Sequence, residues 1–288
     1  KLHKVFAREV EVVDNTNGEN QSGTVKEIVP LTSDLFEQYF NRDYISNLKF
    51  TVYRKYKDSS ADYDIYKVIT GNETADKLYL TPNGNEYYYV FKDLPKKSLP
   101  DGSGNTHFYS YKIVEENQGT EVTKRYSDTN SGFDKNEVTI DTEKIGSTAD
   151  TYVQNVFKAK KITVNKFWDD DDNADNTRPE KLDFTIKETV KNTTIKVDIK
   201  NTLYNEIQKS DNGENVNNTG SWTMEIVLPM YYYNGEVNNN ISYSIEETLD
   251  EISKKYGYTL SVVENRVSNG DVENIESLNL TNKRTRLN

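Results

Sequence analysis

The sequence contains no cysteine and only two histidines. Without thiols there are no disulfides, and a thiolate-based zinc site is excluded. The histidines, His3 and His107, lie far apart in the sequence, so we expect no metal site from them. The sequence also lacks a glycine-rich phosphate loop and a plausible Ser-His-Asp set. We therefore expect no cofactor and no enzyme that turns over an external substrate.

The sequence also lacks long apolar runs, and it has fewer basic than acidic residues. No stretch approaches the roughly 20 residues that span a bilayer. The 36 lysines and arginines are outnumbered by 47 aspartates and glutamates, for a formal net charge of -11. Nucleic acid and anionic membrane surfaces both require a basic face, so neither is an expected partner. An acidic surface mostly serves solubility.

Tyrosine is abundant, with 21 residues, and the chain is rich in alternating apolar and polar stretches. Tyr, Val, Ile and Thr favour strands, and each alternating stretch predicts a strand with one face towards a core. The stretches recur in the same order in both halves, which indicates two domains built on one plan. They are residues 4–6, 48–52, 87–95, 111–115 and 152–155, then 161–168, 182–186, 222–229, 243–247 and 280–283.

We expect the boundary between the domains near residues 157–161, giving one domain at 1–159 and another at 160–288. Pro95 and Pro229 are expected to end their strands, because proline cannot donate to a strand ladder. The joint has no Gly/Ser/Pro linker, so the last strand of the first domain nearly runs into the first strand of the second. Such a joint is expected to restrict bending.

Residues 34–44 interrupt the strand pattern of the first domain. Asp34 and Glu37 have the spacing of a capping box. Four apolar side chains share one face of such a helix: Leu35, Phe36, Tyr39 and Phe40. We expect a short helical insert that packs on the sheets, with a ligand-contacting insert as the alternative. A second insert, residues 203–220, is rich in Asn, Gly and Ser and is expected to be an exposed loop.

The most informative stretch is the alternating strand at 161–168, Lys-Ile-Thr-Val-Asn-Lys-Phe-Trp, which carries Lys166. An acidic run at 169–172 and Arg-Pro-Glu at 178–180 come after it. This pattern resembles the opening of the Cna B-type domain of Gram-positive surface adhesins and pilins. The resemblance is strong in the second half and moderate in the first. It implies an all-β chain of two tandem Ig-like β-sandwich domains.

The resemblance also implies that the strand lysine forms an amide bond with an asparagine near the end of its domain, promoted by an acid. The Tyr-x-Ile-x-Glu stretch places the acid at Glu247, and the Thr-Asn-Lys ending places the partner of Lys166 at Asn282.

In the first half the same roles fall on Lys4, Glu115 and Asn155. The match there is poorer, because no Trp-Asp-Asp loop comes after Lys4 and Gln-Asn replaces Thr-Asn.

The chemistry requires a neutral lysine, whose ordinary pKa near 10.4 keeps it charged at neutral pH. Burial lowers a lysine pKa, and Phe167 and Trp168 make burial of Lys166 plausible. Burial also favours the neutral form of an acid. We therefore expect Glu247 to donate a hydrogen bond to the carbonyl of Asn282 and to shuttle protons as ammonia leaves.

A plainer interpretation exists for each of these features. Lysines are almost never fully buried, so Lys166 could point outward and Glu247 could be a surface acid. The acidic run, extended by Asn173, Asp175 and Asn176, is expected to be an exposed loop; calcium is the alternative, although the EF-hand pattern does not fit. Residues 231–233, three tyrosines, form either a contact surface or the packed end of a strand.

The expected function is a structural stalk or pilin segment of a Gram-positive cell-surface adhesin or pilus, stabilised by its own Lys-Asn bonds. The expected partners are neighbouring domains of a longer surface protein or pilus subunits. The alternative is an adhesin module that binds a host extracellular-matrix ligand through the first domain and its insert. The expected location is extracellular, anchored to the cell wall. No signal peptide or wall-sorting tail is recognisable, so we expect the anchor outside this chain.

Overall fold

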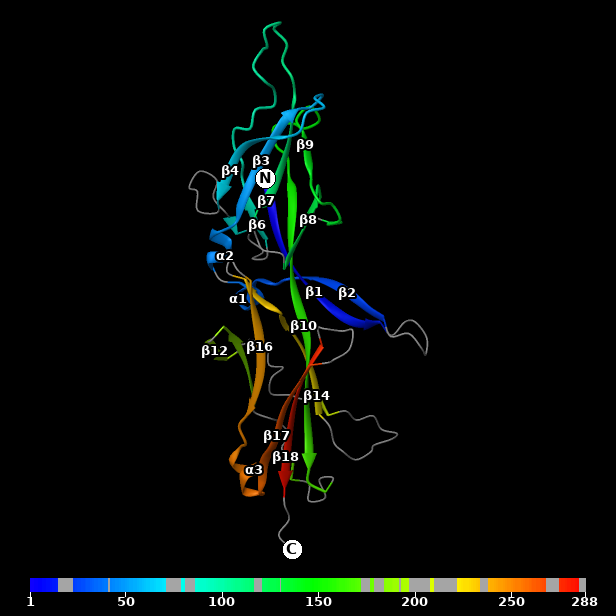
Figure 1. The fold of residues 1–288 in the computed structure, drawn as a ribbon, viewed down its shortest axis with the longest axis vertical. Helices are drawn as coiled ribbons and strands as arrows, with labels where there is room; N and C mark the ends of the chain where they lie inside the picture. Colours follow the sequence, from blue (N-terminus) through cyan, green and yellow to red (C-terminus); the bar gives the residue numbers. More distant parts are fainter. Residues whose placement is uncertain are drawn as a thin grey trace. The chain divides into compact units, whose positions relative to one another are not determined.

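The computed structural model describes residues 1–14, 23–40, 42–70, 79–80, 86–116, 121–129, 131–171, 177–178, 184–191, 193–196, 208–209, 222–233, 238–267 and 275–284 (Figure 1). The described chain is built of strands with a few short helices, so the prediction of an all-β fold with a short helical insert is confirmed. The insert expected at residues 203–220 lies outside the described residues, apart from 208–209.

The elements come in this order along the sequence. Up to residue 141 they are β1 (Leu2–Asp14), β2 (Gly23–Pro30), the 3-10 turn η1 (Ser33–Leu35), α1 (Phe36–Tyr39), α2 (Arg42–Ser46), β3 (Lys49–Tyr56), β4 (Asp64–Thr70), β5 (Tyr79–Leu80), β6 (Glu86–Tyr89), β7 (Tyr109–Glu116), β8 (Val122–Ser127) and β9 (Thr139–Asp141). The remainder are β10 (Thr151–Asp169), β11 (Phe184–Val190), β12 (Thr193–Lys196), β13 (Gln208–Lys209), β14 (Trp222–Pro229), β15 (Tyr231–Tyr233), β16 (Asn238–Glu247), α3 (Glu251–Lys255), β17 (Tyr258–Val267) and β18 (Ile275–Arg284).

These elements form two compact units. Unit 1 comprises Lys1–Glu9, Ile28–Lys158 and Tyr231–Asn238. Unit 2 comprises Val10–Glu27, Ala159–Met230 and Asn239–Asn288. Strand β10 therefore supplies its first part to unit 1 and its second part to unit 2.

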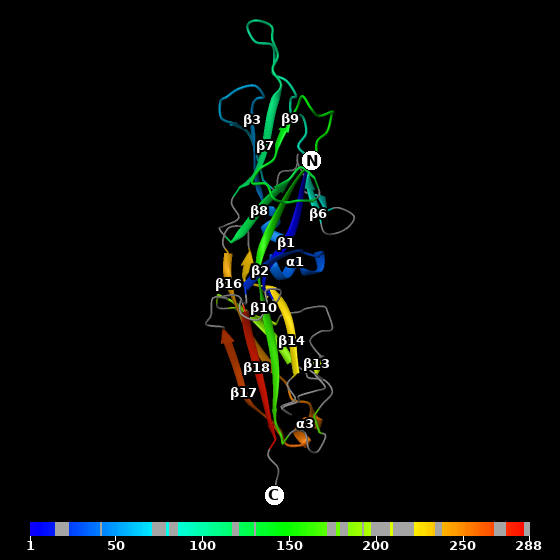
Figure 2. The ribbon, with the colours of Figure 1, turned by 90° about the vertical axis from the view of Figure 1, so that its right-hand side faces the viewer.

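Unit 1 is a sandwich of two sheets. In one, β1 runs parallel to the first part of β10, from Leu2↔Thr151 to Glu9↔Lys158 (Figure 2). Strand β6 pairs with β1 and β8 pairs with β10, both antiparallel. The other sheet has the order β4-β3-β7-β9. The sheets meet through aromatic side chains, such as Phe50 and Tyr89, whose ring centroids are 4.6 Å apart and which are fully buried.

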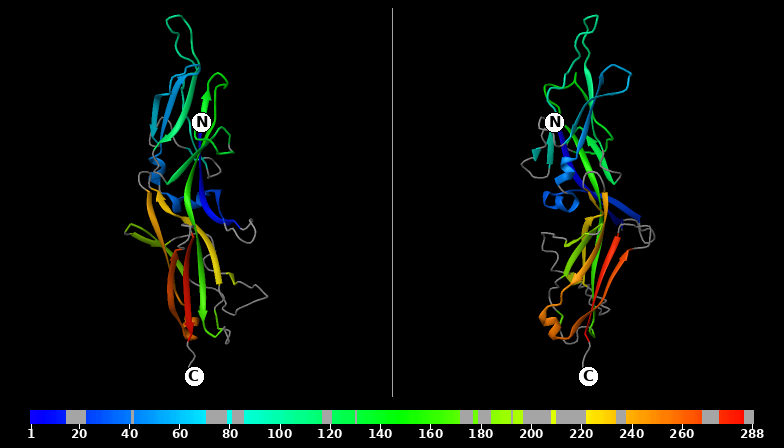
Figure 3. Two further views of the ribbon diagram at one scale, coloured as in Figure 1. Left: turned by 45° about the vertical axis from the view of Figure 1, so that its right-hand side comes forward. Right: turned by 60° about the vertical axis from the view of Figure 1, so that its left-hand side comes forward.

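Unit 2 repeats this plan with the second part of β10. Strand β14 pairs with it antiparallel, and β18 pairs with it parallel, from Lys161↔Ile275 to Asp169↔Lys283 (Figure 3). Strand β17 pairs with β18. In the facing sheet, β11 lies between β12 and β16. Apolar residues from both sheets are 0% exposed: Ile162, Val164, Ile186, Leu278 and Leu280.

The helical insert differs in detail from the single helix expected. It consists of η1, α1 and α2, and the backbone at Phe40, after α1, is extended. Asp34 lies inside η1, and the residue that precedes α1 is Leu35. The aromatic side chains of the segment are nevertheless buried: Phe36, Tyr39, Phe40 and Tyr44. The insert is thus held by packing in unit 1.

Strand β6 ends earlier than expected. The sequence predicted a strand that continues to Pro95, whereas β6 ends at Tyr89. The chain between them includes Asp93 at φ 60°, a left-handed conformation that a strand does not accommodate. In the second unit Pro229 is the last residue of β14, as expected.

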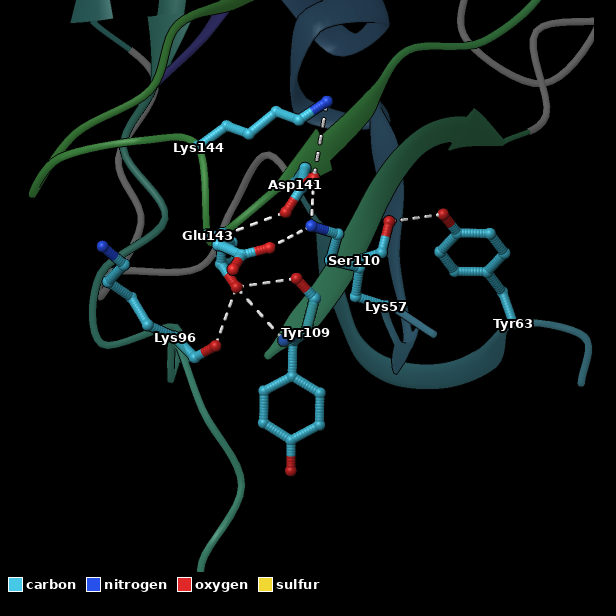
Figure 4. Close-up of polar contacts among 9 residues, drawn as sticks. Lys57, Tyr63, Lys96, Tyr109, Ser110, Asp141, Glu143 and Lys144 are labelled. Atoms are coloured by element: carbon cyan, nitrogen blue, oxygen red, sulfur yellow. Dashed lines mark hydrogen bonds and ion pairs between the residues drawn. The ribbon is translucent and has the colours of Figure 1, made fainter. Parts of the chain in front are cut away.

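Side-chain contacts join the residues after β9 to Tyr109 of β7 and to Lys96, which precedes β7 in the sequence (Figure 4). The hydroxyl oxygen of Thr142 lies 2.7 Å from the carbonyl oxygens of Lys96 and Tyr109 and accepts a hydrogen bond from the Tyr109 amide at 3.1 Å. Lys57 forms ion pairs with Asp141 and with Glu143. These contacts fix the edge strand β9 on β7.

The acidic run after β10 is only partly as expected. Residues 172–176, which include Asn173, Asp175 and Asn176, lie outside the described residues, and Asp171 is exposed. Asp170, expected to be exposed, has a fully buried side chain. Arg178 donates to both of its carboxylate oxygens, at 2.8 and 2.5 Å, and the Tyr258 hydroxyl donates at 2.8 Å. These donors compensate the buried charge, which sequence position alone did not reveal.

The tyrosines of β15 divide between the two alternatives. Tyr233 is fully buried in unit 1, where its ring packs 4.7 Å from that of Phe157. Its hydroxyl donates to the Glu121 carbonyl at 3.2 Å. Tyr231 and Tyr232 are half-buried. The segment therefore packs as the end of a strand.

Two kinds of feature are absent from the part of the chain that the structure describes. None of its helices has the length and apolar character needed to cross a membrane. The same residues include no group of three or more His, Cys, Asp or Glu side chains placed to hold a metal ion.

Candidate functional site: two buried Lys-Glu-Asn clusters

Unit 2 brings together the three residues singled out in the second half of the sequence. The Lys166 ammonium nitrogen lies 2.5 Å from Oε2 of Glu247. The Asn282 side-chain nitrogen donates to Oε1 of the same carboxylate at 2.9 Å. Lys166 and Asn282 are 0% exposed, and the Glu247 side chain is 1% exposed. The glutamate thus bridges the amine and the amide inside the core.

The strands place these side chains by simple alternation. From Ile162 onward every second residue of β10 is buried, and Lys166 falls on that core face. Lys166 pairs with Leu280 across the parallel strands β10 and β18, and Asn282 is two residues further along β18 on the same face. Glu247 reaches the pair from the facing sheet, where it is opposite Phe184.

Burial changes the titration of Lys166. Removal from water lowers its pKa to about 8, and the nearby Glu247 carboxylate opposes this shift only in part. The Lys166 nitrogen also lies 4.9 Å from the ring centroid of Trp168. About a tenth of the amine is therefore neutral at pH 7, far more than for an ordinary lysine.

Unit 1 holds a second cluster of the same composition. The Lys4 nitrogen lies 2.6 Å from Oε2 of Glu115, and the Asn155 side-chain nitrogen donates to Oε1 of Glu115 at 2.6 Å. Lys4 and Asn155 are 0% exposed, and Glu115 is 1% exposed. Burial lowers the pKa of Lys4 to about 8, with Glu115 again opposing the shift.

The register of the first cluster matches that of the second. Lys4 pairs with Val153 across parallel β1 and β10, and Asn155 is two residues further along. Glu115 is opposite Phe50 in the facing sheet, as Glu247 is opposite Phe184.

Each unit also contains a tyrosine-to-proline hydrogen bond at the equivalent place. Four residues before Glu115, the Tyr111 hydroxyl donates to the Pro95 carbonyl at 2.7 Å. Four residues before Glu247, the Tyr243 hydroxyl donates to the Pro229 carbonyl, also at 2.7 Å. The two halves are thus alike in packing as well as in sequence order.

The hydrogen bonds differ from expectation in one respect. From the sequence we expected the glutamate to donate to the asparagine carbonyl, whereas in both clusters the asparagine NH₂ group donates to the glutamate. The carbonyl oxygens of Asn155 and Asn282 are buried and accept no hydrogen bond from the described residues. A half turn of either amide would bring its oxygen to the carboxyl group, which could then donate only if protonated.

Sequence reasoning missed one residue of the first cluster. The Asn155 side-chain nitrogen donates a second hydrogen bond, to the hydroxyl of Tyr44, at 2.7 Å. Tyr44 belongs to α2 of the helical insert and is 0% exposed. No spacing rule connects it with the cluster, because only the packing of the insert brings it there.

Comparison with protein-family models gave no match, and comparison with curated proteins gave none either. Among solved structures, a single B repeat unit of the collagen-binding surface protein of Staphylococcus aureus is 20% identical. It covers 86% of this chain and 95% of its own, with a TM-score of 0.23. The shaft pilin SpaA of Lactobacillus rhamnosus GG is 14% identical, covering 99% and 98%, with a TM-score of 0.28. The basal pilin SpaE of the same organism is 12% identical, covering 100% and 91%, with a TM-score of 0.40.

These three solved structures are a Cna B repeat and two pilins. Because all three TM-scores are below 0.5, the chemistry proposed for this chain rests on the geometry of its own two clusters.

Proposed function

We propose that the chain is a structural segment of a Gram-positive cell-surface adhesin or pilus that crosslinks itself. Its two Cna B-type domains, residues 1–159 and 160–288, each form one Lys-Asn isopeptide bond. The bonds join Lys4 to Asn155 and Lys166 to Asn282. The single observation that carries the proposal is the burial of two Lys-Glu-Asn clusters with the same register and with a bridging glutamate in each.

The reaction needs no external reagent. The neutral lysine amine attacks the carboxamide carbon of the asparagine, and a new C–N bond forms. The glutamate, Glu115 or Glu247, takes a proton from the attacking amine and passes it to the asparagine nitrogen. The original C–N bond breaks and one ammonia leaves. Each domain reacts once, so the chain is not an enzyme in the sense of turnover, and the glutamates are its catalytic acids.

The intact mass of the purified chain under denaturing conditions tests this proposal. We expect a mass lower than that of the sequence by two ammonias. Lys4→Ala and Lys166→Ala should each restore one ammonia beyond the mass change of the substitution, and the double variant should restore both. Glu115→Ala and Glu247→Ala should act in the same way although they keep the lysine and asparagine. Proteolysis and mass spectrometry of the fragments should identify the two branched peptides.

Lys161→Ala is the matched control. Lys161 is on β10 like Lys166, but it is ion-paired with Glu225 at 2.7 Å and partly exposed. Its replacement should leave both ammonia losses in place. A wild-type mass equal to that of the sequence would exclude the chemistry, and an ammonia loss that persists in Lys166→Ala would exclude the assigned residues.

The proposed location is the cell surface, with wall anchoring through a segment outside this chain. The proposed partners are neighbouring domains of a longer surface protein or pilus subunits. For the alternative, a host-ligand-binding module, the helical insert was the candidate contact. Its aromatic residues Phe36, Tyr39, Phe40 and Tyr44 are buried in unit 1, which favours the structural role.

A further inference from the structure

The two clusters differ in the hydrogen bonds of the asparagine side-chain nitrogen, the atom that leaves as ammonia in the proposed reaction. In the described part of unit 2, Glu247 alone accepts a hydrogen bond from the Asn282 side-chain nitrogen. In unit 1 the Asn155 nitrogen is held by two oxygens, Oε1 of Glu115 at 2.6 Å and the Tyr44 hydroxyl at 2.7 Å. The second of these oxygens belongs to Tyr44 of α2, a residue that is not part of the Lys-Glu-Asn pattern of the two units.

Tyr44 is held where it is by the aromatic core of unit 1. Its ring centroid lies 4.8 Å from that of Phe40, 5.5 Å from that of Phe157 and 6.4 Å from that of Phe6. A side chain packed on three sides has little rotational freedom, so its hydroxyl is fixed against the amide. The Lys4 nitrogen lies over the ring of Phe6, 5.3 Å from the centroid of that ring. The insert and the reacting residues therefore share one packed cluster.

We infer that Tyr44 is a fourth catalytic group of the first cluster, and that the helical insert serves to deliver it to the leaving nitrogen of Asn155. This inference rests on the proposed function, because it concerns the same bond between Lys4 and Asn155.

A hydroxyl suits this position because its oxygen accepts a hydrogen bond from the nitrogen. Before reaction the planar amide nitrogen has no basic lone pair, and it donates to Tyr44. Once Lys4 has added to the carboxamide carbon, the nitrogen becomes an amine with one basic lone pair, and the Tyr44 oxygen goes on accepting from its N–H and stabilises the positive charge that forms as the lone pair is protonated. Glu115 delivers to this nitrogen the proton released by Lys4, the bond from carbon to nitrogen breaks, and ammonia leaves. Tyr44 keeps its own proton, in keeping with a pKa that burial raises well above the usual value.

The test compares refolding of the wild type and of Tyr44→Phe. Each chain is purified in denaturant from inclusion bodies, in which it has not folded and reacted, and is refolded by dilution. Samples are quenched at intervals, and intact mass and peptide mapping track each bond separately. Phenylalanine keeps the ring packing and removes only the hydroxyl. We expect the Lys4–Asn155 bond to form about tenfold more slowly, as for the loss of one hydrogen bond to a reacting group. The Lys166–Asn282 bond in the same molecules should form at the wild-type rate.

Tyr39→Phe is the matched control, because Tyr39 is equally buried and packs on Phe157 from α1. It should leave both rates unchanged. A second comparison separates catalysis from folding: Lys4→Ala and Lys4→Ala/Tyr44→Phe both lack the first bond and should refold at the same rate, as followed by circular dichroism.

The outcomes are distinct. A slowed first bond with an unchanged second bond, together with equal refolding rates of Lys4→Ala and Lys4→Ala/Tyr44→Phe, supports the inference. A first bond that forms equally fast in Tyr44→Phe overturns it while leaving the proposed function intact. Slower refolding of the double variant than of Lys4→Ala would assign the slowing to folding and overturn the catalytic role. A wild type that forms the second bond but never the first also overturns it. A wild type that forms neither bond overturns the inference together with the proposed function.

Discussion

Lys166 and Asn282 lie on adjacent parallel strands with their side chains on the same face, because Asn282 is two residues beyond Leu280, the partner of Lys166. Parallel neighbours with this offset bring a long lysine side chain alongside a short amide, and the facing sheet supplies the acid. The same offset separates Asn155 from Val153, the partner of Lys4. A common geometry at two places in one chain points to a common reaction.

Asn282→Ala should destabilise unit 2 strongly. The variant keeps the ion pair between Lys166 and Glu247 but cannot form the bond. A crosslink that closes a loop of this size removes unfolded-state entropy worth about 4–5 kcal/mol, by analogy with disulfides. Guanidinium unfolding should show a loss of this order. Thr259→Ala, at an exposed position on the neighbouring strand, should change stability by less than about 1 kcal/mol. Equal stability of Asn282→Ala and the wild type would contradict the crosslink.

The rate of bond formation should rise with pH. The reacting amine must be neutral, and burial lowers the pKa values of Lys4 and Lys166 to about 8. Below this value the neutral fraction falls about tenfold per pH unit, and above it the rate should level off. Refolding from denaturant at a series of pH values from about 6 to about 9.5, with intact-mass readout, measures this. A rate that still climbs tenfold per unit above about pH 9 would mean that the lysines keep an ordinary pKa.

The lowered pKa also affects the uncrosslinked protein. Folded Asn282→Ala should hold the Lys166 proton less tightly than the unfolded chain does, between about pH 8 and the ordinary lysine pKa of 10.5. Since the unfolded state then binds more protons, stability should increase with pH across this window. With the proposed Lys166–Asn282 bond formed, the wild type would have no free amine at this position and should lack the increase. Urea unfolding of both chains at the two ends of the window gives the comparison.

Removing the hydroxyls of Tyr111 and Tyr243 should have similar effects in the two units. Each donates a hydrogen bond at 2.7 Å to a proline carbonyl. Its loss leaves a carbonyl short of a donor and should cost about 1 kcal/mol in either Tyr→Phe variant. Tyr256→Phe, at a position 45% exposed, is the neutral control. A large loss in only one unit would show that the two contacts are not equivalent.

Arg178→Ala should destabilise unit 2 by about 3–5 kcal/mol, because it leaves the buried Asp170 carboxylate without its cation. Replacing both residues with apolar ones should recover much of that loss. A double-mutant cycle read by chemical unfolding measures the coupling. A coupling energy near zero would mean that Tyr258 and solvent suffice to hold the charge.

The strands that carry the clusters could be predicted because their alternation is local. Residues 243–247, for example, read as a strand with Glu247 on its apolar face, and the structure places them in β16. The order of the landmarks in the two halves likewise depends only on sequence. Together with the family resemblance, these two features single out the six cluster residues without knowledge of any contact: Lys4, Glu115, Asn155, Lys166, Glu247 and Asn282.

What could not be predicted depends on contacts between distant parts of the chain. Asp170 stands in an acidic run and looks exposed until Arg178 and Tyr258 are found around it. Tyr44 looks like a packing residue of a helix, and only the fold brings its hydroxyl to Asn155. The end of β6 at Tyr89 depends on its pairing with β1, in which Tyr89 is opposite Leu2, the first residue of β1, and a tyrosine-rich stretch does not reveal that pairing.

Strand β10 carries both Asn155 and Lys166, one for each cluster. With both bonds formed, the shortest covalent route from Lys1 to Asn288 leaves the main chain at Lys4, rejoins it at Asn155, leaves again at Lys166 and returns at Asn282. Residues 5–154 and 167–281 become side loops of that route. Tension applied at the two ends would run through residues 155–166 of β10 and the two isopeptide bonds, so that covalent bonds alone would carry it. Unfolding either unit would then add no contour length, and a single-molecule pulling trace should show no unfolding steps.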